Sequence, residues 1–446
     1  MKQVIKMITE KEVLNALSQI IDPDFNQDIV SLGFVQNIKI EKSSVAFDIA
    51  LTTPACPVKD FFQKKAEDLI KKIPGVGSVQ VRMTTLPRKS SQAGLNTQSG
   101  LAGVKSIIAV SSCKGGVGKS TLAATLALEL ARRGYKVGLL DCDIHGPSVP
   151  ALFNAQNEKI TINGMNQLIP VEKFHLKIMS FGFLLGDAPA VMRGPMVSQY
   201  IQQILHGTDW GDLDYLFMDM PPGTGDVQLT ITQSVKLNGA VIVTTRQTLS
   251  LVDVARGILM FEKVDVPMLG VIENMSYFIC DNCDKKHYIF GGKASDSLTD
   301  RFGLEMLAEI PVLPQLTARI DGHTTHPSIV DAVDHMIRSL GKTSILKKQI
   351  PAIRFDESNT YLTWPSGEVT SVSHRDLRLS CRCALCINEM TGEQILQETD
   401  VPAAIAPKKI TPLGNYAVGI EWNDGHASGI YPYTQLKEKS LSFKNA

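Results

Sequence analysis

The spacing of apolar residues predicts a small folded unit at the start of the chain. In the segments 44–53 (SVAFDIALTT) and 76–83 (VGSVQVRM), apolar and polar residues alternate, as they do in strands buried on one face. Between them, the apolar residues of 61–73 (FFQKKAEDLIKKI) recur at helical spacing, and Pro74 ends the helix. Residues 1–86 are therefore expected to form a small α/β domain.

Short apolar segments alternate with helical segments from residue 104 to residue 342. Residues 105–112 (KSIIAVSS) are predicted to form a buried strand, and 120–134, rich in Ala and Leu, a helix that ends at Gly134. Alternation of this kind is typical of an α/β fold in which helices cover both faces of a parallel sheet. Further buried strands are predicted at 136–141, 215–219, 239–245 and 268–274.

The segments on either side of this central domain differ from it in composition. Residues 87–103 are rich in Ser, Gly, Gln and Asn and poor in large apolar residues, which is typical of a linker. The last segment, 355–446, contains two similar pieces, 361–367 (YLTWPSG) and 419–425 (GIEWNDG), whose turns suit β-hairpins. We therefore expect a small β-rich domain, in which the two tryptophan hairpins are either a duplicated element or a coincidence.

Charge restricts the kind of protein this can be. The 45 basic and 45 acidic residues cancel, so no overall field attracts the chain to nucleic acid or to an anionic membrane. The start of the chain lacks the continuous apolar core of a secretory signal, shows no evident transit peptide, and no later segment is apolar over the length of a membrane span. These features predict a cytoplasmic protein, or the mature form of a protein of an organellar stroma, that binds neither nucleic acid nor membrane.

The stretch SSCKGGVGKST (111–121) matches a phosphate-binding loop placed between a predicted strand and a predicted helix. Backbone N–H groups of such a loop bind phosphate oxygens, Lys119 reaches the terminal phosphates, and the Ser120 hydroxyl is available to Mg²⁺. A magnesium site also needs a carboxylate at a strand end, which Asp219 supplies after the apolar segment YLFMD. The predicted nucleotide-binding residues of the loop are Gly115, Gly116, Val117, Gly118, Lys119, Ser120 and Thr121.

Two further carboxylates and a second lysine lie near this loop in the predicted fold. Asp141 and Asp143 follow a predicted strand and face opposite ways if the chain stays extended. One of them is available to orient an attacking water while the other braces the site, or both cap the turn at Gly146. Lys114 is a second lysine of the loop; taken alone, it can also be a solvated surface residue.

Five of the eight cysteines are clustered: Cys280, Cys283, Cys381, Cys383 and Cys386. In a reducing compartment, clustered thiols more often bind metal or carry out redox chemistry than form disulfides. The first pair can chelate one metal or two irons of one cluster, but two thiolates do not complete a tetrahedral site. A two-fold dimer supplies a second pair. A zinc ion shared in the same way, a dithiol redox pair, and completion by Cys383 and Cys386 remain alternatives.

Four tracts of the central domain belong together: KGGVGKS in the loop, DCDIHGPS (141–148), MDMPPGTGD (218–226) and ENMSYFICDNC (273–283). Together they resemble the Mrp/ApbC family of P-loop ATPases, which are iron–sulfur cluster carriers. The resemblance covers about residues 104–340, within a wider group that includes septum-site and plasmid-partition ATPases. It implies a homodimer in which Lys114 contacts the nucleotide of the other subunit. A cation between two triphosphates offsets charge that Lys119 alone cannot neutralise.

The same resemblance implies roles for residues outside the loop. It makes Asp143 the residue that orients water, Asp219 the carboxylate beside Mg²⁺, and Asn274 an adenine contact. It also implies that Cys280 and Cys283 of two subunits share a 4Fe-4S cluster.

The outer domains carry resemblances of their own. Residues 22–24 (DPD), 31–33 (SLG) and 51–57 (LTTPACP) resemble SufT- and PaaD-type iron–sulfur assembly factors over about residues 8–86. This resemblance places Cys56 at the functional face, where it is expected either to hold a cluster transiently or to be structural.

The C-terminal segment resembles a small domain of unassigned role, found in the plastid high-chlorophyll-fluorescence scaffold and in γ-butyrobetaine hydroxylases. The residues that carry this resemblance are Trp364, Gly367, Leu377, Arg378, Cys381, Cys383, Cys386 and the tract WNDG (422–425). All three domains in this order match the plastid scaffold and its bacterial relatives. The spacing C-x-C-x-x-C suits a metal with a fourth ligand such as His374, or a redox or buried role.

These features together predict a slow ATPase that binds ATP and Mg²⁺ and carries a 4Fe-4S cluster between the subunits of a homodimer. The chain is expected to work with the cluster assembly machinery and to pass the cluster to apo-proteins. Two alternatives remain. A partition-type positioning ATPase on DNA or membrane would have little use for Cys280 and Cys283. The other alternative is a zinc-stabilised adaptor with vestigial ATPase activity.

Overall fold

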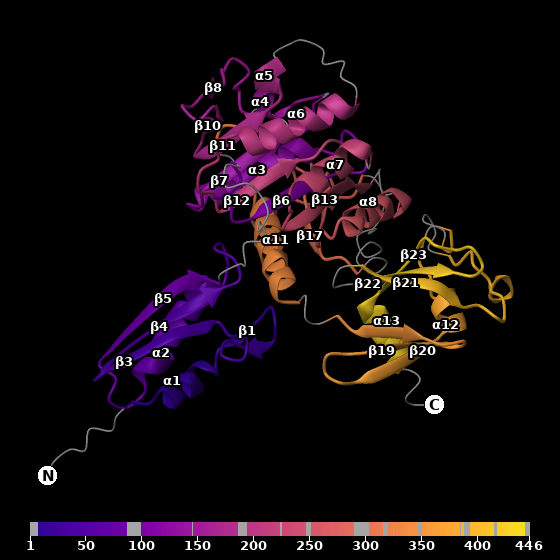
Figure 1. Cartoon of the computed structure of the whole chain (residues 1–446), viewed down its shortest axis with the longest axis horizontal. Helices are drawn as coiled ribbons and strands as arrows, with labels where there is room; N and C mark the ends of the chain where they lie inside the picture. Colours follow the sequence, from indigo (N-terminus) through magenta and orange to yellow (C-terminus); the bar gives the residue numbers. More distant parts are fainter. Residues whose placement is uncertain are drawn as a thin grey trace. The chain divides into compact units, whose positions relative to one another are not determined.

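The computed structural model describes most of the chain as two compact units, residues 1–93 with 337–345 and residues 94–336 with 346–446 (Figure 1). Most of the linker predicted at 87–103 lies outside the described residues. The described residues are 8–86, 100–144, 146–185, 194–223, 225–246, 251–289, 303–314, 320–323, 325–346, 350–383, 385–387, 393–413 and 417–441.

The N-terminal domain is a three-stranded sheet with two helices. Strand β3 pairs antiparallel with β4, and β4 pairs parallel with β5. The connection between the two parallel strands is α2, whose buried Phe62, Ala66 and Ile70 recur every fourth residue and so form one apolar stripe. The predicted strand–helix–strand order is confirmed. The elements are α1 (Glu10–Leu17), β1 (Ile21–Asp22), β2 (Gln27–Asp28), β3 (Val35–Glu41), β4 (Ser44–Leu51), α2 (Lys59–Lys71) and β5 (Ser78–Thr85).

An eight-stranded sheet forms the central domain, in the order β10-β11-β7-β12-β6-β13-β14-β17. Only β10 at one edge is antiparallel to its neighbour, so the predicted parallel α/β core is confirmed. The sheet strands are β6 (Ile107–Ser111), β7 (Val137–Asp141), β10 (Val171–Lys173), β11 (Leu176–Ser180), β12 (Tyr215–Asp219), β13 (Gly239–Thr245), β14 (Met268–Asn274) and β17 (Met306–Glu309).

The strand order places helices on both faces of this sheet. The chain passes from β6 through α3 to β7 in one direction across the sheet. It passes from β12 through α7 to β13, and then through α8 to β14, in the opposite direction. Because parallel crossovers are right-handed, α3 covers the face opposite to α7 and α8. The remaining elements of this domain are α3 (Lys119–Arg132), α4 (Val149–Leu152), β8 (Thr161–Ile162), β9 (Leu168–Ile169), α5 (Gly182–Leu185), α6 (Gly194–Gly207), α7 (Asp226–Ser234), α8 (Leu251–Lys263), β15 (Phe278–Ile279) and β16 (Lys286–His287). The last helix, α11 (Pro327–Leu346), starts in this domain, and its residues 337–345 belong to the N-terminal unit.

The C-terminal domain consists of two antiparallel three-stranded sheets, and each sheet is followed by a helix. The two tryptophan hairpins share one turn geometry. The backbone N–H of Trp364 donates to the carbonyl of Glu368, and that of Trp422 donates to the carbonyl of His426. Gly367 and Gly425, which occupy the same position of the two turns, have positive φ values of 81° and 88°. The common order and turn favour a duplicated element over coincidence. The elements are β18 (Ala352–Phe355), β19 (Asn359–Thr363), β20 (Val369–Ser373), α12 (His374–Leu379), η2 (Glu398–Asp400), β21 (Pro407–Leu413), β22 (Ala417–Trp422), β23 (Gly429–Pro432) and α13 (Tyr433–Leu441).

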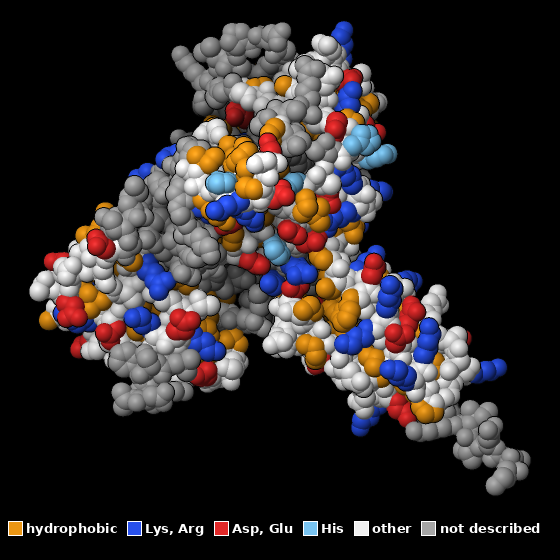
Figure 2. All heavy atoms as spheres, turned by 180° about the vertical axis from the view of Figure 1, so that it is seen from behind, with side chains coloured by type: hydrophobic (Ala, Val, Ile, Leu, Met, Phe, Trp, Pro, Cys, Tyr) orange, Lys and Arg blue, Asp and Glu red, His pale blue; other side chains and the backbone are white. Residues whose placement is uncertain are grey.

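Charged side chains of both signs are interspersed on the face drawn in Figure 2, and neither sign covers a continuous area there. Within the described residues, every helix is too short or too polar to cross a membrane.

Candidate functional site

The phosphate-binding loop connects the end of β6 to the start of α3. Gly116 and Gly118 have positive φ, 79° and 80°, a conformation that side-chain-bearing residues rarely adopt. A Cβ on Gly118 would lie 2.3 Å from Asn274 Nδ2, which donates a hydrogen bond to the carbonyl of Val117 at 2.9 Å. The loop therefore depends on glycine at this position and on Asn274, the last residue of β14.

The lysine of the loop forms a buried ion pair at the adjacent strand end. Lys119 Nζ bonds to Asp219 Oδ1, and it lies 3.3 Å from Ser120 Oγ. Asp219 Oδ2 is buried and has no hydrogen-bond partner among the described residues. Hard cations such as Mg²⁺ prefer oxygen ligands. A buried carboxylate oxygen that accepts no hydrogen bond, together with the serine hydroxyl, offers two such ligands. The residues present therefore fit the magnesium ion expected from the sequence.

A second carboxylate lies next to Asp219 across the sheet, because Asp141 is its register partner in β7. Asp141 is fully buried and accepts hydrogen bonds from Ser180 Oγ at 3.0 Å and from the N–H of Val149 at 3.2 Å and of Asp143 at 3.1 Å. Burial, and then the charge of Asp219, raise the pKa of Asp141 to about 7. Three donors thus hold Asp141 in place, as expected of a bracing residue.

Asp143 and Lys114 occupy more accessible positions than Asp141 and Lys119. Asp143 is half-buried and accepts a hydrogen bond from the N–H of Gly146 at 3.2 Å. The Lys114 side chain is exposed, and its carbonyl accepts a hydrogen bond from Ser112 Oγ at 2.9 Å. Asp143 therefore both caps the turn at Gly146, as one prediction had it, and remains partly accessible.

The cysteine pair 280/283 lies on a hairpin that follows β14 and is formed by β15 and β16. The N–H of Cys280 bonds to the carbonyl of Lys285 at 3.0 Å, and the N–H of Asp284 to that of Cys280 at 2.9 Å. Backbone N–H groups of Asn282 and Cys283 lower the pKa of the Cys280 thiol. Cys283 is exposed and Cys280 half-buried, so both thiols are accessible from outside the chain.

A buried network supports this hairpin from the strand ends. Arg246 at the end of β13 pairs with Glu273 in β14, and their side chains are 1% and 0% exposed. The Arg246 guanidinium also stacks on the ring of Tyr288, 4.3 Å from its centre. Ser276 Oγ donates to Glu273 at 2.6 Å. The hairpin is therefore anchored at the carboxyl ends of the strands, the same end of the sheet that carries the nucleotide loop.

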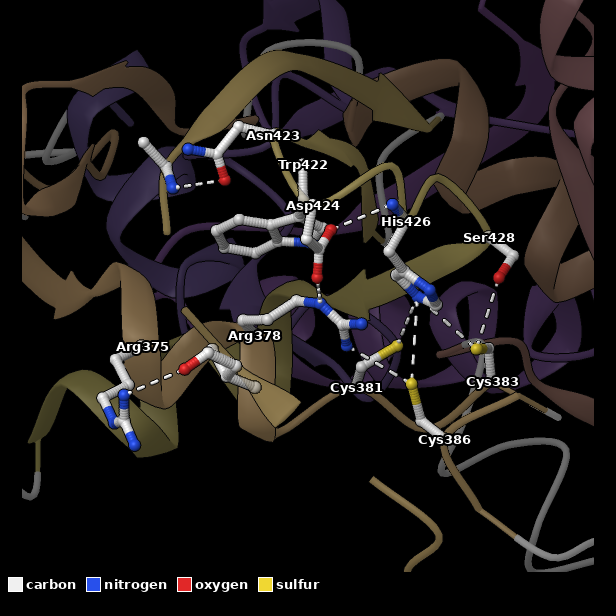
Figure 3. Close-up of polar contacts among 12 residues, drawn as sticks. Arg375, Arg378, Cys381, Cys383, Cys386, Trp422, Asn423, Asp424, His426 and Ser428 are labelled. Carbon is white, nitrogen blue, oxygen red and sulfur yellow. Dashed lines mark hydrogen bonds and ion pairs between the residues drawn. The ribbon is translucent and has the colours of Figure 1, made fainter. Parts of the chain in front are cut away.

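The three C-terminal cysteines converge on one histidine, His426 (Figure 3). Its Nε2 lies 3.3 Å from Cys381 Sγ, 3.5 Å from Cys383 Sγ and 3.9 Å from Cys386 Sγ. The four donor atoms lie within 4.8 Å of one another, and Cys381 and Cys386 are buried. Three thiols and an imidazole match the ligands of tetrahedral zinc sites.

His374 is not the fourth donor, so that expectation was wrong. Its ring is buried and packs 6.4 Å from Phe355 and 6.3 Å from Trp422. Cys383 and Cys386 already belong to the group around His426, which disfavours the alternative in which they complete the Cys280–Cys283 pair.

Comparison with known proteins supplies the family. A model described as NUBPL iron-transfer P-loop NTPase matches residues 103–342. A model of an iron–sulfur cluster assembly protein matches residues 10–81. A model of the N-terminal domain of γ-butyrobetaine hydroxylase-like proteins matches residues 353–437. The chloroplastic Fe-S cluster assembly factor HCF101 of Oryza sativa is 44% identical, over 96% of this chain and 82% of its own length. The chain belongs to the Mrp/NUBPL family of iron–sulfur cluster carriers.

Other relatives match a part of this Mrp-family chain. An iron–sulfur cluster carrier protein of Aquifex aeolicus is 41% identical, over 70% of this chain and 90% of its own length. A solved nucleotide-binding protein from Archaeoglobus fulgidus in complex with ADP is 38% identical, covering 54% of this chain and 90% of that one, with a TM-score of 0.44. The C-terminal domain adds the layout of HCF101-like assembly factors.

Within this Mrp-family fold, the predicted nucleotide residues converge at one end of the sheet. Asp219 and Asn274 are the last residues of β12 and β14, and Lys119 and Ser120 lie in the first turn of α3. Cys56 belongs to the other compact unit and is half-buried, and burial raises its pKa to about 11. A thiol that stays protonated at neutral pH is a poor cluster ligand, which favours the structural role for Cys56.

Sequence reasoning missed several residues of these sites. His287 completes a C-x-x-C-x-x-x-H spacing and so had a readable signal, whereas His426, 40 residues from Cys386 in the sequence, had none. Ser180 and Arg246 had none, because their partners Asp141 and Glu273 are neighbours only through strand pairing.

Proposed function

We propose that this chain is an ATP-driven carrier that holds a 4Fe-4S cluster as cargo between two subunits and passes it to apo-proteins. The observation that carries the proposal is the presence, in one domain, of a P-loop site and of an exposed two-thiol hairpin joined to it by the Arg246–Glu273 network. Family membership supports the cargo. The compartment expected from the sequence is the cytoplasm or an organellar stroma.

Nucleotide binding is proposed to use the groups at the strand ends. When ATP binds, Lys119 leaves its ion pair with Asp219 and binds the terminal phosphates. Asp219 and Ser120 then serve as ligands for Mg²⁺. The ion, when bound, neutralises developing charge on the phosphates. Asp143 orients the attacking water, while Asp141 braces the site from the interior. Asn274 is the proposed adenine contact, in addition to its hydrogen bond to Val117.

Cluster binding is proposed to need two chains. Each hairpin offers two thiols, and a symmetric pair of hairpins offers the four that a 4Fe-4S cluster requires. Backbone N–H groups directed at Cys280 favour its thiolate, the form that binds iron. Lys114 of each subunit is proposed to contact the nucleotide of the other, so that ATP stabilises the pair through contacts that the separated chains lack.

The test is anaerobic reconstitution with iron and sulfide, followed by metal and sulfide analysis per dimer and Mössbauer spectroscopy. We expect one 4Fe-4S cluster per two chains, lost in the Cys280→Ala, Cys283→Ala double variant. A double variant that keeps its cluster would contradict the proposal, as would wild-type protein that stays monomeric with ATP and iron both supplied.

We further propose that Cys381, Cys383, Cys386 and His426 hold a structural zinc ion in the C-terminal domain. The specific observation is a closed four-donor set with two buried thiols, which leaves no open position for chemistry. Purified protein should contain about one zinc per chain, as tetrahedral structural sites do, and His426→Ala should lose it. Retention of zinc in that variant, with loss in His374→Ala, would refute the assignment.

A further inference from the structure

His287 lies on the cysteine hairpin and has no role in the proposed function. Cys280 Sγ, Cys283 Sγ and a ring nitrogen of His287 all lie within 4.8 Å of one another. We propose that these three side chains of a single chain bind one divalent transition-metal ion, such as Zn²⁺ or Fe²⁺, and leave one coordination position open. The inference deepens the proposed function and rests on it, because the same two cysteines are the expected cluster ligands.

The register of the hairpin explains how His287 reaches the cysteines. Phe278 of β15 is directly opposite His287 of β16, so their side chains share a face of the hairpin. Alternation along the strand brings the side chain of Cys280, two residues after Phe278, to that same face. A slip of one residue would turn His287 away from the thiols.

The turn between the strands prepares the thiols for a metal. Asp284 has a positive φ of 54°, which lets the chain reverse directly after Cys283. The carbonyl of Cys280 accepts the N–H of Asp284 at 2.9 Å and closes this turn. A preformed turn lowers the ordering cost of binding an ion.

Contacts on both sides of His287 hold its strand in place. The Lys286 ammonium lies 4.4 Å from the centre of the Tyr277 ring, and the Tyr277 and Tyr288 rings are 5.7 Å apart. Tyr288 in turn packs on the buried Arg246. The residues before and after His287 are therefore fixed, although the His287 side chain itself is exposed.

Donor chemistry indicates which ions this site takes. Two thiolates and one imidazole suit borderline divalent ions such as Zn²⁺, Fe²⁺ and Co²⁺, rather than Mg²⁺ or Ca²⁺. Two thiolates also balance the charge of one such ion. The site has three donors and is exposed, whereas the group around His426 has four donors, two of them buried. We therefore expect the hairpin ion to exchange readily and the C-terminal ion to remain bound.

An open three-donor site gives an unpaired chain a way to hold metal before it meets its partner. When a hairpin that holds an ion meets one that does not, the partner's two thiols release their protons to solvent, take the open position and replace His287, which completes an all-thiolate set. Where both hairpins hold an ion, one of the two ions returns to solvent. This step exchanges ligands only and requires neither an oxidant nor a reductant.

The experiment is an anaerobic Co²⁺ titration of full-length protein whose C-terminal zinc content has been verified. Absorption reports thiolate-to-cobalt charge transfer and the visible bands of tetrahedral Co²⁺, and sedimentation in the same buffer reports the oligomeric state. The variants are His287→Ala, Cys283→Ser, and His323→Ala as a control for loss of an exposed histidine outside the hairpin.

We expect monomeric wild type to bind one Co²⁺ per chain beyond the verified zinc, and His323→Ala to behave alike. Loss of an outer-shell partner already weakens metal sites by about 10–100-fold, so His287→Ala should weaken Co²⁺ binding by at least about 10-fold. Wild-type affinity in His287→Ala would overturn the inference, as would one Co²⁺ per two chains bound only by the dimer.

Cluster reconstitution on the same variants separates this inference from the proposed function. Loss of the cluster in Cys283→Ser together with unchanged Co²⁺ affinity in His287→Ala would remove only the three-donor site. A cluster retained by the Cys280→Ala, Cys283→Ala double variant would remove the proposed function, whatever the cobalt result.

Discussion

Replacing Asp141 by Asn should remove a pH dependence of stability from the central domain. The pKa of this carboxyl rises from an ordinary 3.8 to about 7 in the folded chain, mainly through burial. Between these two values the folded chain keeps a proton that the unfolded chain has lost, so stability falls as pH rises and levels off above about pH 7. At about 1.4 kcal/mol per pKa unit, the whole effect is roughly 4 kcal/mol.

Part of this range is accessible to measurement. Between about pH 5 and about pH 8 the Asp141 contribution corresponds to roughly 3 kcal/mol. Because the chain has several domains, global unfolding is unsuitable, and the free energy of opening of β7 and β12 should be taken from hydrogen exchange. We expect the opening free energy of the wild type to fall over this range by more than that of Asp141→Asn, and the difference between the two profiles reports Asp141 together with its electrostatic coupling to Asp219.

Two comparisons separate the titration of Asp141 from the loss of its hydrogen bonds. Asn can replace only some of the hydrogen bonds that Asp141 accepts from Ser180, Val149 and Asp143, but this loss is an offset that does not vary with pH. Ser180→Ala keeps the carboxyl and removes a donor, so its profile should keep falling to higher pH. Adding Mg²⁺ and ADP to the wild type should flatten the profile, because a nearby cation favours ionised carboxylates. Parallel profiles for wild type and Asp141→Asn would refute the reasoning.

Three further outcomes follow from the other sites. Arg378→Met removes the donor that lies 3.3 Å from Cys386 Sγ, and chelator-induced zinc release should show an affinity about 10–100-fold lower. Arg246→Met leaves the buried Glu273 without its ion-pair partner, which should lower the free energy of opening of β14, measured by hydrogen exchange, by about 3–5 kcal/mol. The double variant Arg246→Met, Glu273→Met should recover most of this free energy. Lys114→Ala should keep ATP affinity in equilibrium binding yet lower steady-state hydrolysis by roughly 10²-fold or more, as loss of a charge donor at the phosphates does; unchanged turnover would exclude its role across the dimer.

The central strands were predictable because parallel strands buried on both faces appear in sequence as uninterrupted apolar runs. The segments YLFMD (215–219) and GAVIVTT (239–245) coincide with β12 and β13 for this reason. In β11 (LKIMS) a lysine at the second position interrupts the apolar run, and β17 (MLAE) has only four residues, so no such run marked them. The sheet could be predicted, but its edges could not.

The metal-binding groups show a different limit. Spacing along the chain marked the cysteines correctly, but it favoured His374, seven residues before Cys381, over His426, which is far more distant in sequence. His426 reaches the thiols because the β22–β23 hairpin returns beside α12, and a turn of that kind fixes direction only in three dimensions. Local spacing therefore identifies donors that share a turn, and it fails when strand pairing supplies the last one.

The end of β14 is where the proposed coupling between nucleotide and cluster has its shortest path. Asn274 contacts the loop through Val117, and the residue before it, Glu273, pairs with Arg246 beneath the hairpin. Neighbouring residues of a strand point to opposite sides, so one strand end touches both sites without bringing them together. A ligand shifts an equilibrium only through contacts that differ between two states, and these two side chains are contacts that a shift of the loop would alter. We therefore expect nucleotide to change the cobalt spectrum of the wild-type hairpin and to leave that of Arg246→Met unchanged, although each ligand still binds to the variant. A change that persists in Arg246→Met would place the coupling elsewhere.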